Sequence, residues 1–489
     1  MSDVTSFAVA VLVAGAIGLA VLAGSHLSER IRVPLPALVL LATALAVQLV
    51  PHFHPVSQTT VSRVVTVALI TVLFSGGMGI GRSRFRSAAR PILIVGVAGT
   101  FATAALAGVF IHLAFGFAWY PSLLVATAVS PTDPTVVFSV LGRRQVAGRS
   151  GTVLEGESGA NDPVGIALMA GLLGAGGLSW SGAGHVLYTF ALQMAVGGLI
   201  GVAGGRLLLL AMRRLPLPDE GLYPLRTLAG AFLLYGLAAL AHGSGFLAVF
   251  SAGIMIGDER APYKREIERF HGAVASLGEI VAFVALGLTV DLAVLDRSST
   301  WVPGIVLGLA LAAVIRPAVV ALCLLRSRLP ARERIFVQVA GLKGAVPILL
   351  GGYLLGTRLT DPPRLYGVVV VVVIFSVVVQ GGPVGPLTRA LRLPVHMVEP
   401  EPWSVGVRLR SDPANVHSVE VAPDSKAAGV AVAELDGLPE DAWVTLLVRR
   451  GRLLAVRGDT RLEAGDRLTV LADAGDADTL RRAFGPARG

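Results

Sequence analysis

An apolar run is interrupted at Ser130-Pro131-Thr132-Asp133-Pro134, where two prolines enclose an acidic residue. Prolines donate no backbone hydrogen bond, so a membrane helix that contains this stretch is predicted to break there. The next apolar run contains a second acidic stretch, Glu157-Ser158-Gly159-Ala160-Asn161-Asp162-Pro163. A charge at bilayer depth costs about 3 kcal/mol or more and is rarely kept there without a function. Two such carboxylates, Asp133 and Asp162, each followed by a proline, indicate an ion path.

The composition is that of a membrane protein. Of 489 residues, 54% are hydrophobic and 15% are charged, whereas a soluble protein carries about 25% charged residues. Residues 5–24 are interpreted as a retained first span, because Asp3 is the only charge before them. The net charge is +9, but the basic residues fall between apolar spans and no aromatic residues are interleaved with them. Nucleic-acid binding is therefore excluded.

The apolar runs predict an all-α polytopic membrane fold with about 13 transmembrane helices. Basic residues gather in alternate connections, such as 82–90 and 326–334, while connections such as 116–121 and 176–185 carry none. By the positive-inside rule, the amino terminus lies outside and the tail is cytoplasmic. We therefore expect a multi-pass protein of the cytoplasmic (inner) membrane, with residues 1–393 forming the transmembrane exchange domain.

Residues 394–489 have the composition of a soluble domain, and we expect a small α+β cytoplasmic unit. Four segments read as short strands and one as a closing helix. The predicted strands are Val405–Leu409, Trp443–Val448, Leu453–Val456 and Leu468–Leu471, and the predicted helix is Ala477–Phe484.

A second interrupted helix is predicted at Gly341, Gly344 and Pro347. It lies an odd number of spans after the first, and an odd offset reverses the direction of a helix in the membrane. Interrupted helices in corresponding positions of two halves indicate a transporter binding site. We therefore predict inverted repeats with two crossing broken helices around one site, which opens alternately to the two sides.

The polar groups of the first break suit a hard monovalent cation. Freed backbone carbonyls near Thr132 and the carboxylate of Asp133 offer oxygen ligands, which such cations prefer. A desolvated carboxylate holds either a proton or a cation, and competition for one anionic site is sufficient for exchange.

In the second stretch, i,i+4 spacing puts Ser158 and Asp162 on one helix face and Glu157 and Asn161 on another. Ser158 and Asp162 are predicted to face the first break. Glu157 is predicted to form a structural ion pair with Lys343, the cation of the second break, because an unpaired charge there is costly. This pair is expected to position the site more than to carry ions.

With these residues the chain resembles monovalent cation:proton antiporters of the NhaP type, within the cation:proton antiporter superfamily. The resemblance implies a core domain that moves against a dimerisation domain, and a homodimer in the lipid bilayer. The matching motifs are Thr132-Asp133-Pro134, Gly156-Glu157-Ser158 with Asn161-Asp162, residues 283–288, Arg316-Pro317 and Gly341-Leu342-Lys343-Gly344-Ala345-Val346-Pro347.

The resemblance also implies roles for single residues. Asp162 is the main carrier, and Thr132, Asp133 and Ser158 help to form the monovalent cation site. The pair Asn161-Asp162, in place of two aspartates, implies electroneutral exchange of the cation for a proton.

Three charged residues in the apolar spans, Lys343, Arg316 and Glu279, need an interpretation of their own. The basic partner of the buried glutamate is usually arginine in such proteins, so Lys343 is a departure: lysine is a point charge, whereas arginine is a bidentate fork. Arg316 is interpreted as structural. Glu279 is interpreted as a residue at the rim of the path.

The tail is similar to the TrkA-C (RCK-C) regulatory module at Gly458-Asp459-Thr460 and Gly465-Asp466-Arg467-Leu468. Such modules bind small-molecule ligands or dimerise. Together with an antiporter, the module favours potassium as the exchanged cation, but the sequence leaves potassium and sodium both open.

Two other functions compete with transport by exchange. A cation channel gated by the cytoplasmic domain remains the alternative, although no fourfold selectivity filter is present in the sequence. An intramembrane aspartyl protease needs two aspartates that share a proton, but here prolines and a basic partner flank them. We expect a transporter, not an enzyme, without cofactors. Cys323 is the sole cysteine, which excludes a disulfide framework and a cysteine metal site.

Overall fold

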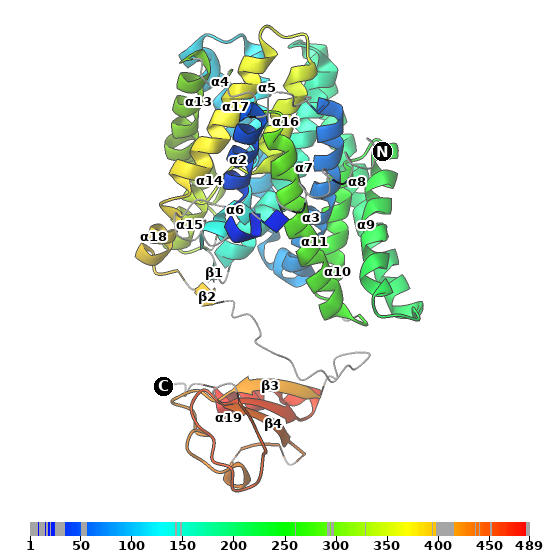
Figure 1. Cartoon of the computed structure of the whole chain (residues 1–489), viewed down its shortest axis with the longest axis vertical. Coiled ribbons are helices and arrows are strands. Elements are labelled where there is room, and N and C mark those ends of the chain that lie inside the picture. Colours follow the sequence, from blue (N-terminus) through cyan, green and yellow to red (C-terminus); the bar gives the residue numbers. More distant parts are fainter. Residues whose placement is uncertain are drawn as a thin grey trace. The chain divides into compact units, whose positions relative to one another are not determined.

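A computed structural model gives the fold of the chain (Figure 1). It describes residues 35–49, 56–141, 144–146, 149–259, 261–290, 298–327, 329–393, 395–397, 415–435, 437–439, 441–449 and 452–485, together with residues 8, 15, 18, 19, 21–24 and 294. The chain divides into two compact units, Met1–Pro402 and Trp403–Gly489. The predicted strand Val405–Leu409 and most of the predicted first span lie outside the described residues.

The first unit consists of helices that run side by side (Figure 1). Six helical stretches of the described part are long and apolar enough to cross a membrane. This confirms a mostly helical membrane unit, whereas the count of about 13 spans stays a prediction. The elements are α2 (Leu35–Leu49), α3 (Gln58–Leu93), η1 (Ile94–Gly99), α4 (Thr100–Phe115), α5 (Trp119–Ala128), α6 (Pro134–Leu141), β1 (Arg144–Val146), α7 (Arg149–Ala175), α8 (Trp180–Arg214), α9 (Leu222–Leu240), α10 (Gly245–Gly257), α11 (Lys264–Gly287), α13 (Ser298–Ala310), η2 (Leu311–Ile315), α14 (Arg316–Cys323), α15 (Ala331–Val339), α16 (Ala345–Gly352), η3 (Tyr353–Gly356), α17 (Pro362–Phe375), η4 (Ser376–Gln380), α18 (Val384–Ala390) and β2 (Val395–Met397), which pairs antiparallel with β1.

Small residues let the helices around α7 approach closely. A Cβ atom at Gly77 of α3 would lie 2.4 Å from the carbonyl oxygen of Phe250 in α10, so the two backbones are in contact there. The Phe250 ring in turn occupies the space beside Gly159 of α7, and the Cβ atom of Ala160 fills the space beside Gly96 of η1. Helices in lipid associate through such close packing, because lipid tails are as apolar as their side chains. These contacts fix α7, which carries the second acidic stretch.

The arginine-rich connection predicted at 82–90 is helical in the structure. Gly81, with φ of 67°, interrupts α3, and the helix then resumes at Arg82 and continues to Leu93. The carboxylate of Asp258 accepts a hydrogen bond from the backbone nitrogen of Ser83, which caps the resumed helix. The positive φ favours glycine, and a Cβ atom at Gly81 would also collide with the Asp258 carboxylate.

The described residues of the second unit form a four-stranded antiparallel sheet in the order β3-β6-β4-β5, with one α-helix and two short 3-10 helices, η5 (Val432–Glu434) and η6 (Ala474–Asp476). Its elements are β3 (Val416–Glu420), β4 (Trp443–Arg449), β5 (Arg452–Leu454), β6 (Arg467–Leu471) and α19 (Ala477–Phe484). The predictions of α19 and of strands at β4, β5 and β6 agree with these elements, while β3 was not predicted. Leu447, Leu468 and Phe484 are buried in its core. Arg449 binds Asp466 at 2.8 Å, and this hydrogen bond raises the pKa of Arg449.

Candidate functional site

The two predicted interruptions meet at one point in the membrane unit. One lies between α5 and α6, and the other lies between α15 and α16. The backbone nitrogen of Asp133 in the first break donates to the carbonyl oxygen of Leu342 in the second, at 2.8 Å. The motifs that are far apart in the sequence therefore form one polar centre.

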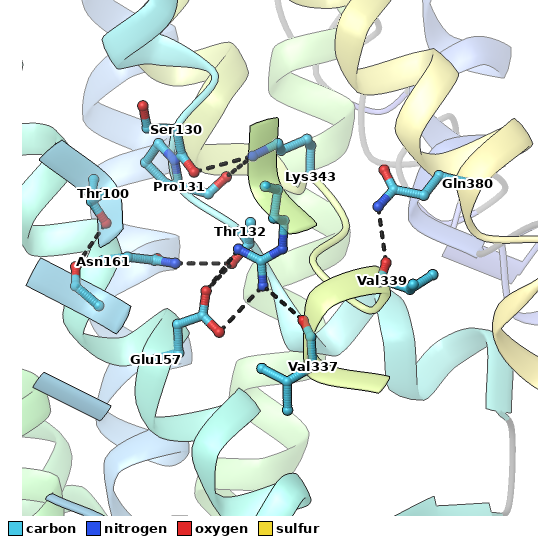
Figure 2. Close-up of polar contacts among 12 residues, drawn as sticks. Thr100, Ser130, Pro131, Thr132, Glu157, Asn161, Val337, Val339, Lys343 and Gln380 are labelled. Atoms are coloured by element: carbon cyan, nitrogen blue, oxygen red, sulfur yellow. Dashed lines mark hydrogen bonds and ion pairs between the residues drawn. The ribbon is translucent and has the colours of Figure 1, made fainter. Parts of the chain in front are cut away.

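The first break exposes carbonyls that an intact helix would use. The carbonyl of Ser130 would accept from residue 134, but Pro134 has no N–H. The ammonium of Lys343 takes this place: its Nζ donates to the carbonyl oxygens of Ser130 at 3.1 Å and Pro131 at 3.2 Å (Figure 2). A cation at the carboxyl end of α5 also complements the helix dipole. These carbonyls are thus bound to Lys343, which corrects the expectation that they are free to ligate the transported cation.

Side chains from neighbouring helices satisfy the second break in the same way. Arg316 Nη2 donates to the carbonyl oxygen of Val337 at 3.3 Å, and Gln380 Nε2 donates to that of Val339 at 2.9 Å. The backbone nitrogen of Lys343 donates to Ser376 Oγ at 3.1 Å. Such partners are needed because no water satisfies backbone groups at this depth.

The predicted ion pair between Glu157 and Lys343 is wrong. Glu157 binds Arg316 instead, with Nη1 2.8 Å from Oε1 and Nη2 3.2 Å from Oε2. Both side chains are buried, with exposed fractions of 2% and 7%. Arginine retains its charge and matches both carboxylate oxygens, whereas the single ammonium of lysine is satisfied by two carbonyls. Glu157 therefore pairs with the arginine, whose two N–H groups match its two carboxylate oxygens.

A short hydrogen-bond chain joins α7 to the first break. Asn161 Nδ2 donates to Thr132 Oγ1 at 2.9 Å, and Thr132 Oγ1 donates to Glu157 Oε1 at 3.4 Å (Figure 2). The predicted shared face of Glu157 and Asn161 is thus the face that meets Thr132. Asn161 Oδ1 is buried and has no hydrogen-bond partner among the described residues. A buried acceptor without a donor is a place where a cation or a water would bind.

Asp133 is held by the start of two helices. Its Oδ1 accepts from the backbone nitrogen of Thr135 at 2.8 Å and from Thr135 Oγ1 at 2.6 Å, as the capping residue of α6. Gly344, directly before α16, lies so close that its Cβ position would be 2.0 Å from Asp133 Oδ2. The positive ends of α6 and α16 therefore both lie against this carboxylate.

Thr135 also links Asp133 to Glu279 of α11. Thr135 Oγ1 lies 3.1 Å from Glu279 Oε1, and Glu279 is partly exposed. A hydroxyl carries one proton, so it donates to one of the two carboxylates at a time. Glu279 is therefore bound to the polar centre through one hydroxyl.

Asp162 differs from the other acidic residues of the site. Its exposed fraction is 7%, and no hydrogen bond or ion pair reaches its carboxylate within the described ranges. Asp133 and Lys343 both act on it electrostatically. Ser158, one turn earlier on α7, is buried as well. Asp162 is thus a buried carboxylate without an internal partner.

Several residues of this centre were not predicted from the sequence. Thr135 had a detectable signal, because Asp133-Pro134 is a typical capping residue followed by a proline at the first helical position. Arg316 was interpreted as structural, but its partner was not predicted, although a buried arginine keeps its charge and requires an acidic partner. Ser376 and Gln380 had none, because only the tertiary structure brings η4 to the second break.

We expect Gly344→Ala to abolish the transport activity proposed below. The added methyl group would collide with the Asp133 carboxylate, and overpacking of this kind costs about 1–3 kcal/mol. Gly356→Ala is the matched control, because nothing lies within 4 Å of its Cβ position. The measurement is cation-dependent proton flux at equal amounts of folded protein. Full flux in Gly344→Ala would contradict the close approach of Asp133 and α16.

Comparison with known proteins identifies the family. A sequence model described as "Sodium/hydrogen exchanger, transmembrane" matches residues 17–390, and the TrkA-C domain model matches residues 416–485. The chain belongs to the sodium/hydrogen exchanger family. The second match confirms the TrkA-C tail, and the relatives described next confirm the resemblance to NhaP-type antiporters. This family member is a multi-pass membrane protein.

Named relatives agree with this assignment. The chain is 34% identical over 337 residues to the K(+)/H(+) antiporter NhaP of Alkalimonas amylolytica, which covers 68% of this chain and 57% of that relative. It is 30% identical over 438 residues to the K(+)/H(+) antiporter NhaP2 of Shewanella sp. (strain MR-4), which covers 88% of this chain and 75% of the relative. The fold is similar to that of the sodium proton antiporter MjNhaP1 from Methanocaldococcus jannaschii, with a TM-score of 0.65, 21% identity, and coverage of 78% of this chain and 99% of that one.

Proposed function

We propose that this exchanger carries a monovalent cation in one direction and protons in the other, as a secondary active antiporter. The observation that carries the proposal is the unequal pairing of three carboxylates, of which Glu157 and Asp162 are buried and Asp133 is partly buried. Glu157 is bound to Arg316, and Asp133 is bound by Thr135 and two helix ends. Asp162 has no internal partner within the described part of the chain. Its negative charge is therefore the one that a cation or a proton would neutralise.

We assign Asp162 as the carrier, and Ser158, Thr132 and the free Oδ1 of Asn161 as neutral ligands. Hard monovalent cations prefer such oxygen atoms. Asp133 contributes negative charge to the same centre. The cation and the proton compete for one carboxylate. Without either of them the carboxylate is negatively charged, which is costly at this depth, so the site crosses the membrane mainly when occupied.

The movement that we propose is alternating access. Two inverted repeats, with about 13 transmembrane helices in all, would place the two crossing broken helices at the middle of the membrane. The core that holds these helices would move against a dimerisation domain within a homodimer in the bilayer. Exchange would be electroneutral, with the amino terminus outside. What supports the arrangement is the contact between Asp133 and Leu342, which joins the two breaks.

For the cation we propose potassium or sodium. Two relatives named above carry potassium/proton antiporter in their names, and the structural neighbour is titled a sodium proton antiporter. The vesicle assay described next distinguishes the two cations.

Everted membrane vesicles test the function directly. Respiration first acidifies the vesicle interior, and potassium chloride or sodium chloride is then added. Loss of the proton gradient on addition of one cation, with no such loss in vesicles that lack the protein, is the expected result. No response to either cation across a broad pH range, in full-length protein and in protein shortened after Leu393, would contradict the proposal.

Glu279 is proposed to attract the cation at the entrance of the site. Glu279→Gln is expected to raise the apparent KM for the cation about fivefold, with little change in maximal rate. A fivefold change corresponds to the loss of an attraction of about 1 kcal/mol between the carboxylate and the cation. Glu266→Gln is the matched control, because Glu266 is exposed on the same helix, at the far end. An unchanged KM in Glu279→Gln would mean that the contact with Thr135 is structural.

For the tail we propose a cytoplasmic regulatory role. Residues 394–489 would form the regulatory domain, and residues 1–393 the exchange domain. A TrkA-C match over residues 416–485 supports a module that binds a small-molecule ligand or dimerises.

A further inference from the structure

Two arginines of the membrane unit lie in one groove without an acidic partner. The groove has a volume of about 510 Å³ and lies between the end of α3 with η1 and the end of α14. Arg90 forms one side, and Arg326 forms the other. Both side chains are exposed, and neither makes an ion pair with an acidic residue in the described ranges. Two unpaired guanidinium groups on facing walls would bind an anion.

The rest of the lining is mostly apolar. Pro91 and Ile94 contribute on one wall, and Leu322 and Leu325 on the other. The exposed fractions of Leu322 and Leu325 are 70% and 63%. A ligand that fills the groove therefore needs an anionic head for the arginines and an apolar part for these side chains. A phospholipid has both, whereas a free phosphate ion would leave the apolar walls uncovered.

We propose that this groove binds an anionic phospholipid, with its phosphate between Arg90 and Arg326 and its acyl chains along Leu322 and Leu325. Both arginines belong to the basic connections that the positive-inside rule puts on the cytoplasmic side, so the lipid belongs to that leaflet. Basic pockets between membrane helices on this side bind such headgroups. The carboxyl end of α14 also borders the groove, and its dipole repels anions. The two guanidinium groups therefore supply the attraction.

Both walls of the groove continue into the polar centre. Arg316, the partner of Glu157, is the first residue of α14. On the other wall, Gly96 of η1 lies against Ala160 and the carbonyl oxygen of Glu157 in α7. The lipid would thus hold together two elements that position the same buried ion pair.

The sole cysteine of the chain lines the groove and provides the test. Cys323 is half-buried there, so a bound lipid would shield its thiol from a maleimide. Full-length protein in a neutral detergent is labelled after addition of phosphatidylglycerol, phosphatidylcholine or inorganic phosphate. Phosphatidylglycerol is expected to slow labelling several-fold, while the other two leave the rate unchanged. Because the readout is the labelling rate, the result does not depend on the proposed transport.

Two double variants test whether the protection of Cys323 depends on the arginines of this groove. Arg90→Gln/Arg326→Gln is expected to lose the protection. The matched control, Arg82→Gln/Arg86→Gln, removes the same charge from a neighbouring cavity that Asp258 and Glu259 also line, and is expected to keep it. Equal protection by phosphatidylcholine in the unaltered protein overturns the proposal without any variant, as does protection that persists in Arg90→Gln/Arg326→Gln. Protection by inorganic phosphate alone would mean a site for a free anion and not for a lipid.

Discussion

Asp162→Asn is expected to reduce cation/proton exchange to the background of vesicles that lack the protein. The amide keeps the size of the side chain but has no negative charge and no group that ionises near neutral pH. Since Asp162 makes no hydrogen bond or ion pair within the described ranges, the substitution breaks no internal contact. Its folded yield should therefore equal that of the unaltered protein. The measurement is dissipation of the proton gradient on addition of potassium or sodium chloride.

The effect should be graded among the ligands of the site. Ser158→Ala removes one neutral oxygen and is expected to weaken cation binding without abolishing exchange. Asp219→Asn is the control for loss of an acidic group, because Asp219 lies in the connection between α8 and α9, away from both breaks. Full exchange in Asp162→Asn would refute its assignment as the carrier.

Arg316→Leu is expected to destabilise the folded protein by about 3–5 kcal/mol, because it leaves the Glu157 carboxylate buried without its partner. It also frees the carbonyl oxygen of Val337 at the second break. The double variant Glu157→Leu/Arg316→Leu removes both charges and should recover much of this loss. Thermal unfolding in detergent, with the four proteins of the double-mutant cycle, measures the coupling.

Lys343 provides the comparison that distinguishes the two possible partners of Glu157. The cycle of Glu157→Leu with Lys343→Met should show weaker coupling than the cycle with Arg316→Leu, since Lys343 donates to the carbonyls of Ser130 and Pro131. Stronger coupling of Glu157 to Lys343 than to Arg316 would contradict the ion pair described above.

Local chemistry made much of the site predictable. Proline at 131 and 134 removes backbone donors wherever the chain lies, so the first break followed from the sequence. The i,i+4 spacing of Glu157 and Asn161 needed only a helix, and α7 is one. The predicted helix Ala477–Phe484 coincides with α19 for the same reason, since its pattern is local.

The choice of partners was not predictable in this way. Lys343 and Arg316 are both basic residues in apolar segments, and the sequence does not state which lies nearer to Glu157. The structure pairs Glu157 with Arg316 because α14 packs against α15 and η1, which both pack against α7, and this packing brings the guanidinium to the carboxylate. Space is reserved for that side chain, because a Cβ atom at Gly341 would lie 1.6 Å from Arg316 Nε.

The sequence by itself determined that the chain is a membrane protein of helices with two breaks, that acidic residues lie at the first break and in the helix that follows it, and that a small soluble unit follows. Composition, helix periodicity and proline chemistry act over a few residues and need no fold. Only the tertiary structure decided that Arg316 binds Glu157, that Lys343 caps α5, and that Asp162 is left without an internal partner. Ion pairs and caps depend on distances between helices far apart in the chain, and those distances arise only when the helices pack.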